Sequence, residues 1–458
     1  MLRKEHFQHK IRPNLFALSP FIVFISTYIF LIIFYQNADN HLKLTSFPIF
    51  SCLAAITFSF FIFKEKISFK KKVKILISGI SNLTVIYMCL IFIFSSVFSH
   101  IVTLNGGVDA AIKIANKAIP TNWLLPGIFV AIATFALTIG SSIGSIATFM
   151  PIAVGISQRF NINPALMAGI IVSGSMLGDN LSVISDTTIA AIHTTNCNPY
   201  KKFKENAILV LPAFIITLAI LALINFSISE LIYTEIVPPI VLQDFVKIIP
   251  YLGVLLLALI GIDVLVVLFS GSLIASAIGI FYGNFTFFDS ITFFFEGFYQ
   301  QKGIVSMVVL VMLIAGLSRT VEHNGGIKYL LYRFHKRTRT KVGAELSIAL
   351  LTILIETFIA RNTISILIAG PIAQQIGGRF KVASARIASL LDIFACTIHG
   401  ILPYSSQLLL AAAMSNISSI SLIPHLHYLF IIFIVTTLSI VKTKIQEDRK
   451  NYIGENHE

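Results

Sequence analysis

Charged side chains are scarce in this chain. Asp, Glu, Lys and Arg make up 12% of its 458 residues, whereas 56% of the residues are hydrophobic. Soluble globular proteins devote roughly a quarter of their residues to these four charged types. With a mean hydropathy of +0.86, the chain cannot cover an ordinary water-exposed surface. The composition therefore excludes a soluble enzyme or binding domain and indicates a membrane protein.

Two other absences narrow the class of protein further. The four cysteines, Cys52, Cys89, Cys197 and Cys396, are scattered and form no CxxC pair, so the sequence predicts neither a zinc site nor a disulfide framework. The dipeptide Gly-Lys occurs nowhere, which excludes a Walker A loop and disfavours an ATP-driven pump. The sequence therefore predicts a protein without a resident cofactor.

Long apolar runs are present instead. A helix needs roughly 20 apolar residues to cross the hydrocarbon core of a bilayer. Runs of about this length, or long enough to form part of a crossing, cover residues 14–36, 46–63, 75–98, 124–139, 206–227, 249–281, 304–317, 346–359 and 425–441. They predict an all-α polytopic membrane protein with about 10–13 transmembrane helices and no large soluble domain.

The formal net charge of +13 is distributed over short loops and both tails. The basic clusters are Lys64, Lys66, Lys70, Lys71, Lys72 and Lys74; Lys201, Lys202 and Lys204; and Arg333, Lys336, Arg337, Arg339 and Lys341. This is the positive-inside pattern, and it predicts a multi-pass protein of the cell (inner) membrane with both termini cytoplasmic. It also argues against a nucleic-acid partner. The connection 230–245, which carries Glu230, Glu235 and Asp244, is predicted to lie outside.

The chain repeats itself at about half its length. NGGV at 105–108 recurs as NGGI at 324–327, and PIAVGISQRF at 151–160 recurs as PIAQQIGGRF at 371–380, with offsets of 219 and 220. Basic residues follow the second NGG densely and the first sparsely, so the two copies are predicted to face opposite sides. Two inverted-topology repeats with broken or re-entrant helices are typical of secondary transporters. We assign residues 1–229 and 246–442 to the repeats, 230–245 to the external connection and 443–458 to a cytoplasmic tail.

One polar stretch, GDNLSVISDTT at 178–188, interrupts an otherwise apolar region. If the helix unwinds there, its oxygen atoms can converge on one hard cation or proton, and Asp179 and Asp186 become candidate Na⁺ ligands, with no transition metal. Competition between a proton and a cation at one desolvated carboxylate would give antiport. The alternative is that these residues only cap helices. The candidate cation- and proton-binding residues are Asp179, Asn180, Ser182, Ser185, Asp186, Thr187 and Thr188.

The second half offers fewer candidates. Asn362, Thr363 and Asp392 are assigned to its part of the site, although Asp392 could instead pair with Arg386. Arg361 either pairs with Glu356, since buried charges need partners, or contacts a substrate carboxylate.

Two histidines remain ambiguous. His193 and His399 titrate near neutral pH and are candidates for pH sensing, or they are simply hydrogen-bonded within the fold.

The motifs resemble those of the NhaC-type Na⁺/H⁺ antiporters. The resemblance covers TIGSSIGSIATFMPIA and the stretch ending in GDNLSVISDTTIAA in the first half, and NTISILIAGPIA and ARIASLLDIFACTIHGILPYSSQ in the second. It implies two inverted units with broken helices and a homodimer. The family commonly has Pro where this chain has Val183, and that departure favours relatives that carry amino or organic acids.

We therefore expect a secondary antiporter that exchanges a monovalent cation, Na⁺, for protons by alternating access. The alternative is an H⁺- or Na⁺-coupled transporter of a small amino or organic acid on the same scaffold. An intramembrane enzyme using Ser185, Asp186 and His193 is disfavoured, because no nucleophile elbow or HExxH motif occurs.

Overall fold

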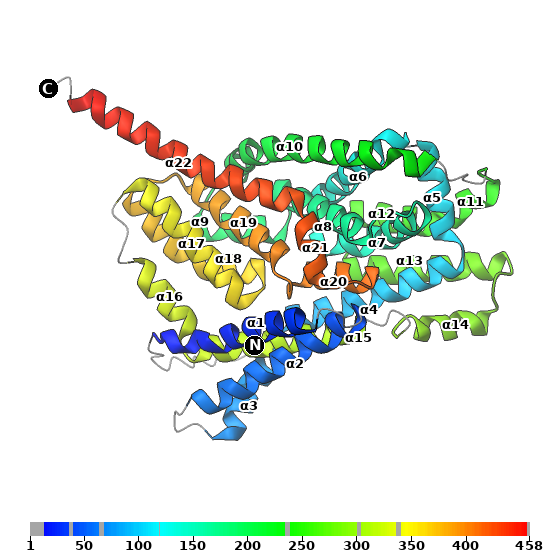
Figure 1. The fold of residues 1–458 in the computed structure, drawn as a ribbon, viewed down its shortest axis with the longest axis horizontal. Coiled ribbons are helices and arrows are strands. Elements are labelled where there is room, and N and C mark those ends of the chain that lie inside the picture. The colour runs from blue at the N-terminus through cyan, green and yellow to red at the C-terminus, as the bar shows by residue number, and fades with distance from the viewer. Residues whose placement is uncertain are drawn as a thin grey trace.

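The computed structural model describes residues 13–35, 40–63, 68–118, 120–233, 239–299, 304–335 and 340–455. Within these ranges the chain forms α-helices and three short 3₁₀ helices, and no strand (Figure 1). Eight helices are long and apolar enough to cross a membrane, or nine if the bent pair at 419–442 is one span. The expectation of an all-α polytopic membrane protein is confirmed.

The number of spans in the described residues is smaller than the predicted 10–13 because several helices are short or interrupted. Ser46–Ile62 and Leu124–Ile139 are apolar but shorter than the other spans. The predicted run 75–98 is broken at Ser81 and Asn82, and the run 249–281 is broken before Asp263, whose side chain caps the next helix. Asp263 therefore lies in a turn that divides the run 249–281 into two helices, α12 (Ile249–Leu259) and α13 (Val264–Phe281).

The helices fall into two similar series. The first is α4 (Leu83–Leu104), α5 (Gly107–Ala118), α6 (Leu124–Ile139), α7 (Ser142–Arg159), α8 (Pro164–Leu181), α9 (Asp186–Thr195) and α10 (Pro199–Tyr233). The second is α15 (Ile304–His323), α16 (Gly326–His335), α17 (Lys341–Ile359), α18 (Asn362–Arg379), α19 (Ser384–Ile401), α20 (Ser406–Ser415), α21 (Ser419–Leu422) and α22 (His427–Glu455). The remaining helices are α1 (Ser19–Phe34), α2 (Asn40–Ile62), α3 (Phe69–Ile80), α11 (Leu242–Lys247), α12 (Ile249–Leu259), α13 (Val264–Phe281) and α14 (Phe287–Glu296).

Three consecutive helices of the first series match three helices of the second series in length and spacing. Helices α18, α19 and α20 each begin 220 positions after α7, α8 and α9 (362 against 142, 384 against 164, 406 against 186), and they have the same lengths. Figure 1 shows α5 and α16, the helices that follow the two NGG motifs, at opposite ends of the molecule. Both observations support the inverted repeat that we propose for this chain.

The proposed domain boundaries do not coincide with helix ends. Helix α10 continues to Tyr233, beyond 229, and α11 spans the boundary at 245–246. Helix α22 runs through 442 without a break. Residues 234–238 of the proposed external connection, including Glu235, lie outside the described residues.

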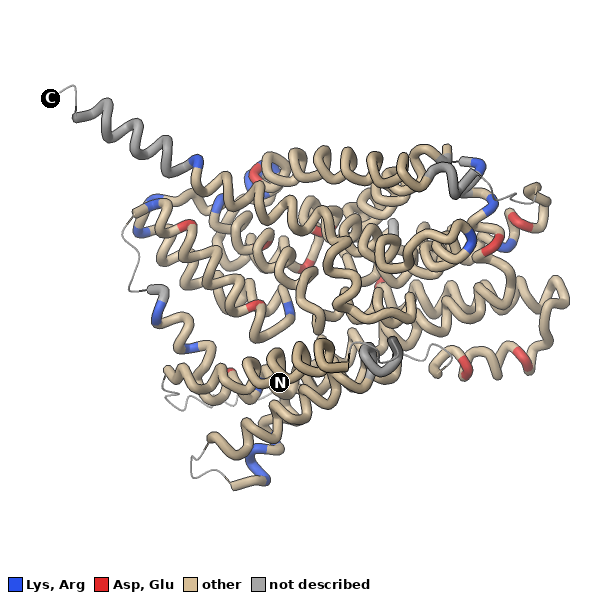
Figure 2. Tube along the Cα trace, viewed as in Figure 1, with Lys and Arg blue, Asp and Glu red and all other residues tan. Residues whose placement is uncertain are grey.

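Charge is unevenly distributed over the described residues. Figure 2 shows Lys and Arg at the end where α16, α17 and the start of α10 lie, and also around α5 and α11 at the other end, where the acidic residues of α11 and α14 lie. Lys64, Lys66, Lys336, Arg337 and Arg339 and the residues 1–12 and 456–458 lie outside the described residues. The orientation of the chain therefore stays a prediction from the positive-inside pattern.

Helices α6 and α8 approach each other closely because α8 presents Gly174 and Gly178 to its neighbour. A Cβ atom on Gly178 would lie 2.3 Å from the backbone oxygen of Ala133 and 2.5 Å from the backbone nitrogen of Leu137. Small residues at this spacing let transmembrane helix backbones pack tightly. The last turn of α8, which carries Asp179, is thereby held against α6.

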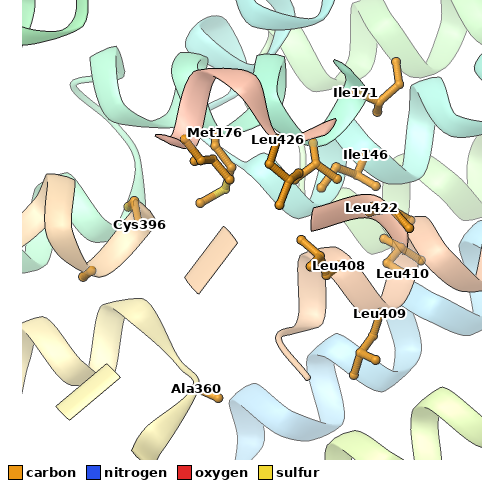
Figure 3. Close-up of a cluster of buried hydrophobic side chains, with 14 of the residues drawn as sticks. Ile146, Ile171, Met176, Ala360, Cys396, Leu408, Leu409, Leu410, Leu422 and Leu426 are labelled. Carbon is orange, nitrogen blue, oxygen red and sulfur yellow. The ribbon is translucent and has the colours of Figure 1, made fainter. Parts of the chain in front are cut away.

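An apolar cluster surrounds the half-helix α20. Figure 3 shows Leu408 and Leu410 of α20 near Leu422 of α21, and Met176 of α8 near Leu426. All five side chains are buried. This packing holds the short helix α20 inside the protein, where it would be unstable on its own.

Replacement of Gly178 by alanine is expected to destabilise the protein. The added Cβ meets backbone atoms that cannot rotate away, and overpacking of this kind costs about 1–3 kcal/mol. Thermal unfolding in detergent measures the effect. The matched control is Gly378→Ala, which has nothing within 4 Å of the new Cβ. An equal melting temperature for the two variants would contradict the close contact between α6 and α8.

Candidate functional site

The polar stretch of the first half is a break between two half-helices. Helix α8 ends where the Ser182 amide donates to the carbonyl oxygens of Gly178 and Asp179, and α9 begins where the Ser185 hydroxyl accepts from the Thr188 amide at 3.2 Å. The extended backbone at Ser182 and Ser185 separates them. Serine capping thus marks the break in the first half, whereas the second-half break at 402–405 contains Pro403.

A second broken helix crosses this one. Gly140, between α6 and α7, has a left-handed backbone with φ of 70°, and a Cβ there would lie 3.0 Å from the Ser185 amide nitrogen. Only glycine permits both the backbone angle and the close approach. The start of α7, including Ser142, is thereby placed beside the end of α8.

The structure buries six of the seven residues predicted in the first half. Asp179, Asn180, Ser182, Ser185, Thr187 and Thr188 are each at most 4% exposed. Asp186 is the exception: it is the first residue of α9 and its side chain is exposed. The predicted convergence of both carboxylates in one dry shell is therefore absent, because the Ser185 cap turns Asp186 outward.

A buried ion pair lies at the centre of the site. Lys202 Nζ of α10 lies 2.5 Å from Asp392 Oδ2 of α19, and both side chains are at most 1% exposed. Lys202 also donates to the Thr188 hydroxyl, which in turn donates to the Ser182 carbonyl oxygen at 2.8 Å. The ammonium group therefore ties the first-half break to a carboxylate of the second half.

The assignment of Lys202 to a cytoplasmic basic loop was wrong. Of Lys201, Lys202 and Lys204, only Lys202 is buried, because α10 already begins at Pro199 and turns that residue inward. Asn206 follows four residues later on the same face and donates to Asp392 Oδ2 at 2.9 Å. The i, i+4 spacing of a lysine and an asparagine next to an apolar run is the signal that would have found both residues.

Amide groups extend the network. Asn206 Nδ2 also donates to the Asn180 carbonyl oxygen at 2.7 Å, and Asn180 Nδ2 donates to the Tyr428 hydroxyl at 3.0 Å. The side-chain oxygens of Asn180 and Asn206 are buried without a hydrogen-bond partner in the described structure. Buried polar oxygens normally have partners, so these two are open to a ligand.

Asp179 completes the charge of the site. Its carboxylate interacts with the Ser142 hydroxyl and lies within electrostatic range of Asp392 and Lys202. Two carboxylates and one ammonium give this cluster a formal charge of −1 when all three groups are ionised. An uncompensated charge inside a membrane is costly, so the cluster favours one added monovalent cation or proton.

The second-half candidates are only partly at the site. Asn362 is buried at the start of α18, and its Nδ2 lies 3.8 Å from Cys396 Sγ, which lies 3.6 Å from Asp392 Oδ1. Thr363 is half-buried. Arg361 instead donates to Asn82 Oδ1 at 2.8 Å, so its predicted pairing with Glu356 is wrong. Within the described structure, the Arg361 side chain therefore contacts Asn82, the N-cap residue of α4, and is not part of the buried cluster.

The alternative prediction that Asp392 pairs with Arg386 is wrong. Arg386 pairs with Glu345 at 2.9 Å and with Glu205 at 3.6 Å, so Asp392 is free of it. The reason is that Arg386 lies two turns before Asp392 on α19, and the nearest acidic side chains at that level are on α10 and α17.

The two histidines have different surroundings. His399 is fully buried, and its Nδ1 lies 2.6 Å from Glu356 Oε1. Its Nε2 contacts the side-chain oxygens of Ser406 and Gln407. His193, by contrast, is exposed on α9. Among the described residues, no group of three or more His, Cys, Asp or Glu is placed to hold a metal ion, so a transported cation would rely on mixed oxygen ligands.

Replacing Lys202 by methionine is expected to destabilise the protein by about 3–5 kcal/mol, because it leaves buried carboxylates without a counter-charge. The double variant Lys202→Met/Asp392→Asn should regain most of the stability, because it removes a buried carboxylate together with its counter-charge. Thermal unfolding in detergent measures these differences.

The matched control is Lys204→Met, two residues away and exposed. A similar loss in Lys204→Met, or no recovery in the double variant, would argue against the buried ion pair.

Comparison with known proteins agrees with this geometry. The sequence profile of the family described as Na⁺/H⁺ antiporter family matches residues 1–228 and 223–442 of the chain. A similar protein is the malate-2H⁺/Na⁺-lactate antiporter of Bacillus subtilis, 23% identical over 376 residues, which are 74% of this chain and 80% of that protein.

Two others carry the name Na⁺/H⁺ antiporter NhaC. The Bacillus subtilis protein is 22% identical over 449 residues, 92% of this chain and 95% of the relative. The Alkalihalophilus pseudofirmus protein is 21% identical over 360 residues, 73% of this chain and 77% of the relative. Since the two profile matches cover both helix series and the buried site between them, this chain belongs to the Na⁺/H⁺ antiporter family.

Proposed function

We propose that this chain is a secondary active transporter that exchanges Na⁺ for H⁺ by alternating access. The observation that carries the proposal is the buried cluster of Asp179, Asp392 and Lys202, with its one excess negative charge and its open amide oxygens. Family membership and the relatives named as Na⁺/H⁺ antiporters support the same exchange.

Competition for one carboxylate is the core of the mechanism. Asp179 has no ammonium of its own, since the Lys202 ammonium is bonded to Asp392 and Thr188. Either Na⁺ or H⁺ at Asp179 brings the cluster to neutrality, and the two together would give it an unfavourable positive charge. Binding of one therefore displaces the other.

Oxygen ligands for Na⁺ are available around Asp179. We assign the Asp179 carboxylate, the Ser142 hydroxyl and the Asn180 side-chain oxygen to its shell. Hard cations prefer such all-oxygen surroundings. The exposed Asp186 lies within electrostatic range of Asp179, and we propose that it attracts cations to the entrance of the site.

Alternating access would use the breaks in the helices. Asp179 lies halfway along the interrupted span Pro164–Thr195, at the level of the break. Half-helix ends at this depth place partial charges of the backbone near a transported ion. We further propose the cell (inner) membrane as location, cytoplasmic termini, and a homodimer in the lipid bilayer, with no nucleic-acid partner.

A small carboxylic or amino acid as substrate is the second candidate. A polar cavity of about 340 Å³ is lined by Arg361, Arg319, Asn82 and Ser318, among others. The Arg361 Nε is buried there without a hydrogen-bond partner in the described structure. The relative that is named as exchanging malate and lactate, and Val183 in place of proline, also favour this candidate.

Asp179→Asn is expected to abolish Na⁺-driven proton movement, because an amide can neither bind a proton nor neutralise Na⁺. Asp186→Asn should have a smaller effect, since that carboxylate is exposed. The measurement uses purified protein in liposomes with an internal pH dye and separate pulses of Na⁺, Li⁺, K⁺, malate and an amino acid.

The matched control is Asp289→Asn, an exposed cap of α14 that should retain full exchange. Wild-type activity in Asp179→Asn would refute the assigned site. A response only to the organic solutes would select the second candidate.

A further inference from the structure

A second buried pair of titratable side chains lies away from the cation cluster. Glu356 of α17 and His399 of α19 are both 0% exposed, and their side chains lie 2.6 Å apart. Among the described residues, Glu356 forms no ion pair with a lysine or arginine, although the Arg361 guanidinium, which donates to Asn82, lies within electrostatic range of it. The second carboxylate oxygen of Glu356 is buried without a hydrogen-bond partner in the described structure.

His399 occupies the position in the second repeat that Asp179 occupies in the first. Asp179 lies three residues before the break at Ser182, and His399 lies three residues before the break at Leu402. Each lies halfway along its interrupted span, Pro164–Thr195 and Ser384–Ser415. The two repeats therefore place one titratable group each at the same level of the membrane-spanning region.

A chain of hydrogen bonds connects the two positions. His399 Nε2 contacts the Gln407 side-chain oxygen, and Gln407 Nε2 donates to the Ser142 hydroxyl at 3.1 Å. Ser142 interacts with the Asp179 carboxylate. A change of charge or protonation at His399 can thus affect Asp179 through two intervening side chains, Gln407 and Ser142.

A small cavity leads towards the pair. It has a volume of about 20 Å³ and is lined by Arg361, Tyr404 and Ser406, among others. The Ser406 hydroxyl lies 3.3 Å from His399 Nε2. This volume suffices for one water molecule. Arg361, Ala315 and Ile359 also line the larger polar cavity of about 340 Å³, so the two cavities adjoin.

The charge of the pair depends on a single proton. With Glu356 ionised and His399 neutral the pair carries −1, and with one added proton it is neutral. A net charge in this dry location is costly, and either an added proton on the pair or an added positive charge nearby lowers that cost.

Two titratable groups outside the pair interact electrostatically with Glu356 in the described structure, Arg361 and Tyr404, and Arg361 also interacts with Glu322. The helices packed against α19 carry Asp179, Asp186, His193, Lys202, Glu205, Glu345 and Tyr428, among others, and α19 itself carries Arg386, Asp392 and Cys396. None of them is hydrogen-bonded to Glu356 or His399 in the described structure.

We propose that Glu356 and His399 form a dedicated proton-binding site, distinct from the cation cluster, that loads from the cavity beside Ser406. The inference rests on the proposed Na⁺/H⁺ exchange at Asp179 and adds a second proton-binding site to it. Na⁺ at Asp179 supplies the positive charge that lets the pair release its proton, and loss of Na⁺ lets the pair take one up. The hydrogen-bond chain through Gln407 and Ser142 couples the two events.

Glu356→Gln tests the proposal because glutamine keeps the shape and hydrogen bond of the side chain but removes the acid. Two activities are measured in liposomes: Na⁺-driven proton movement, and exchange of radiolabelled Na⁺ for Na⁺ without a pH gradient. We expect Na⁺-driven proton movement to fall about tenfold or more, because the pair can no longer bind its proton. Na⁺/Na⁺ exchange should stay within about twofold of wild type, because it needs no proton. A tenfold change corresponds to about 1.36 kcal/mol. His399→Gln should behave in the same way.

Glu345→Gln is the matched control, because Glu345 is also buried on α17 but is bonded to Arg386. It should retain both activities. Proton movement at the wild-type level in Glu356→Gln, or a parallel fall of both activities in a folded variant, would overturn the proton site. Absence of both activities in the wild-type protein would instead refute the proposed Na⁺/H⁺ exchange itself.

Discussion

The fold depends on one electrostatic constraint, the cost of holding charge inside a membrane. The Lys202–Asp392 pair satisfies most of it, with both groups buried and joined at 2.5 Å. Removing one partner of such a pair costs more than the pair contributes, so the two groups are fixed to each other. Since Lys202 lies on α10 and Asp392 on α19, this contact joins the two helix series where their breaks meet. The negative charge of Asp179 then remains uncompensated, and in the proposed mechanism a bound Na⁺ or H⁺ neutralises it.

The breaks in the helices bring the polar groups of the site together. A continuous α8–α9 helix would present its polar groups in different directions along some 10 Å of axis. The interruption at residues 182–185 frees backbone carbonyls, and Ser182 already uses one to accept from Thr188. The tight contact of Gly140 with the Ser185 amide and the close packing of Gly178 against α6 hold the break in place. Gly140 and Gly178 therefore fix the position of the break by close packing.

The two repeats carry different titratable side chains at equivalent positions. The first repeat carries Asp179 and the second carries His399, and their environments differ accordingly. Asp179 interacts with the Ser142 hydroxyl and lies within electrostatic range of the Lys202 ammonium, surroundings that suit a cation. His399 faces a glutamate and a glutamine, which suits a proton. A duplicated fold can thus hold two unlike ions while it keeps one architecture, because backbone geometry is repeated and side chains are not.

The sequence by itself determined the membrane class, the helix breaks and the repeat pattern, because these follow from local composition and spacing. It also singled out Asp179, Asn180 and Asp392, because polar residues in membrane-spanning helices are energetically costly and therefore point to a functional site. Only the tertiary structure decided which charges meet. Lys202 could be recognised as buried only once α10 was placed against α19, and Asp186 as exposed only once the Ser185 cap was formed. Partners such as Glu356 and His399 are 43 residues apart in the chain, and no local pattern encodes a contact that depends on how whole helices pack.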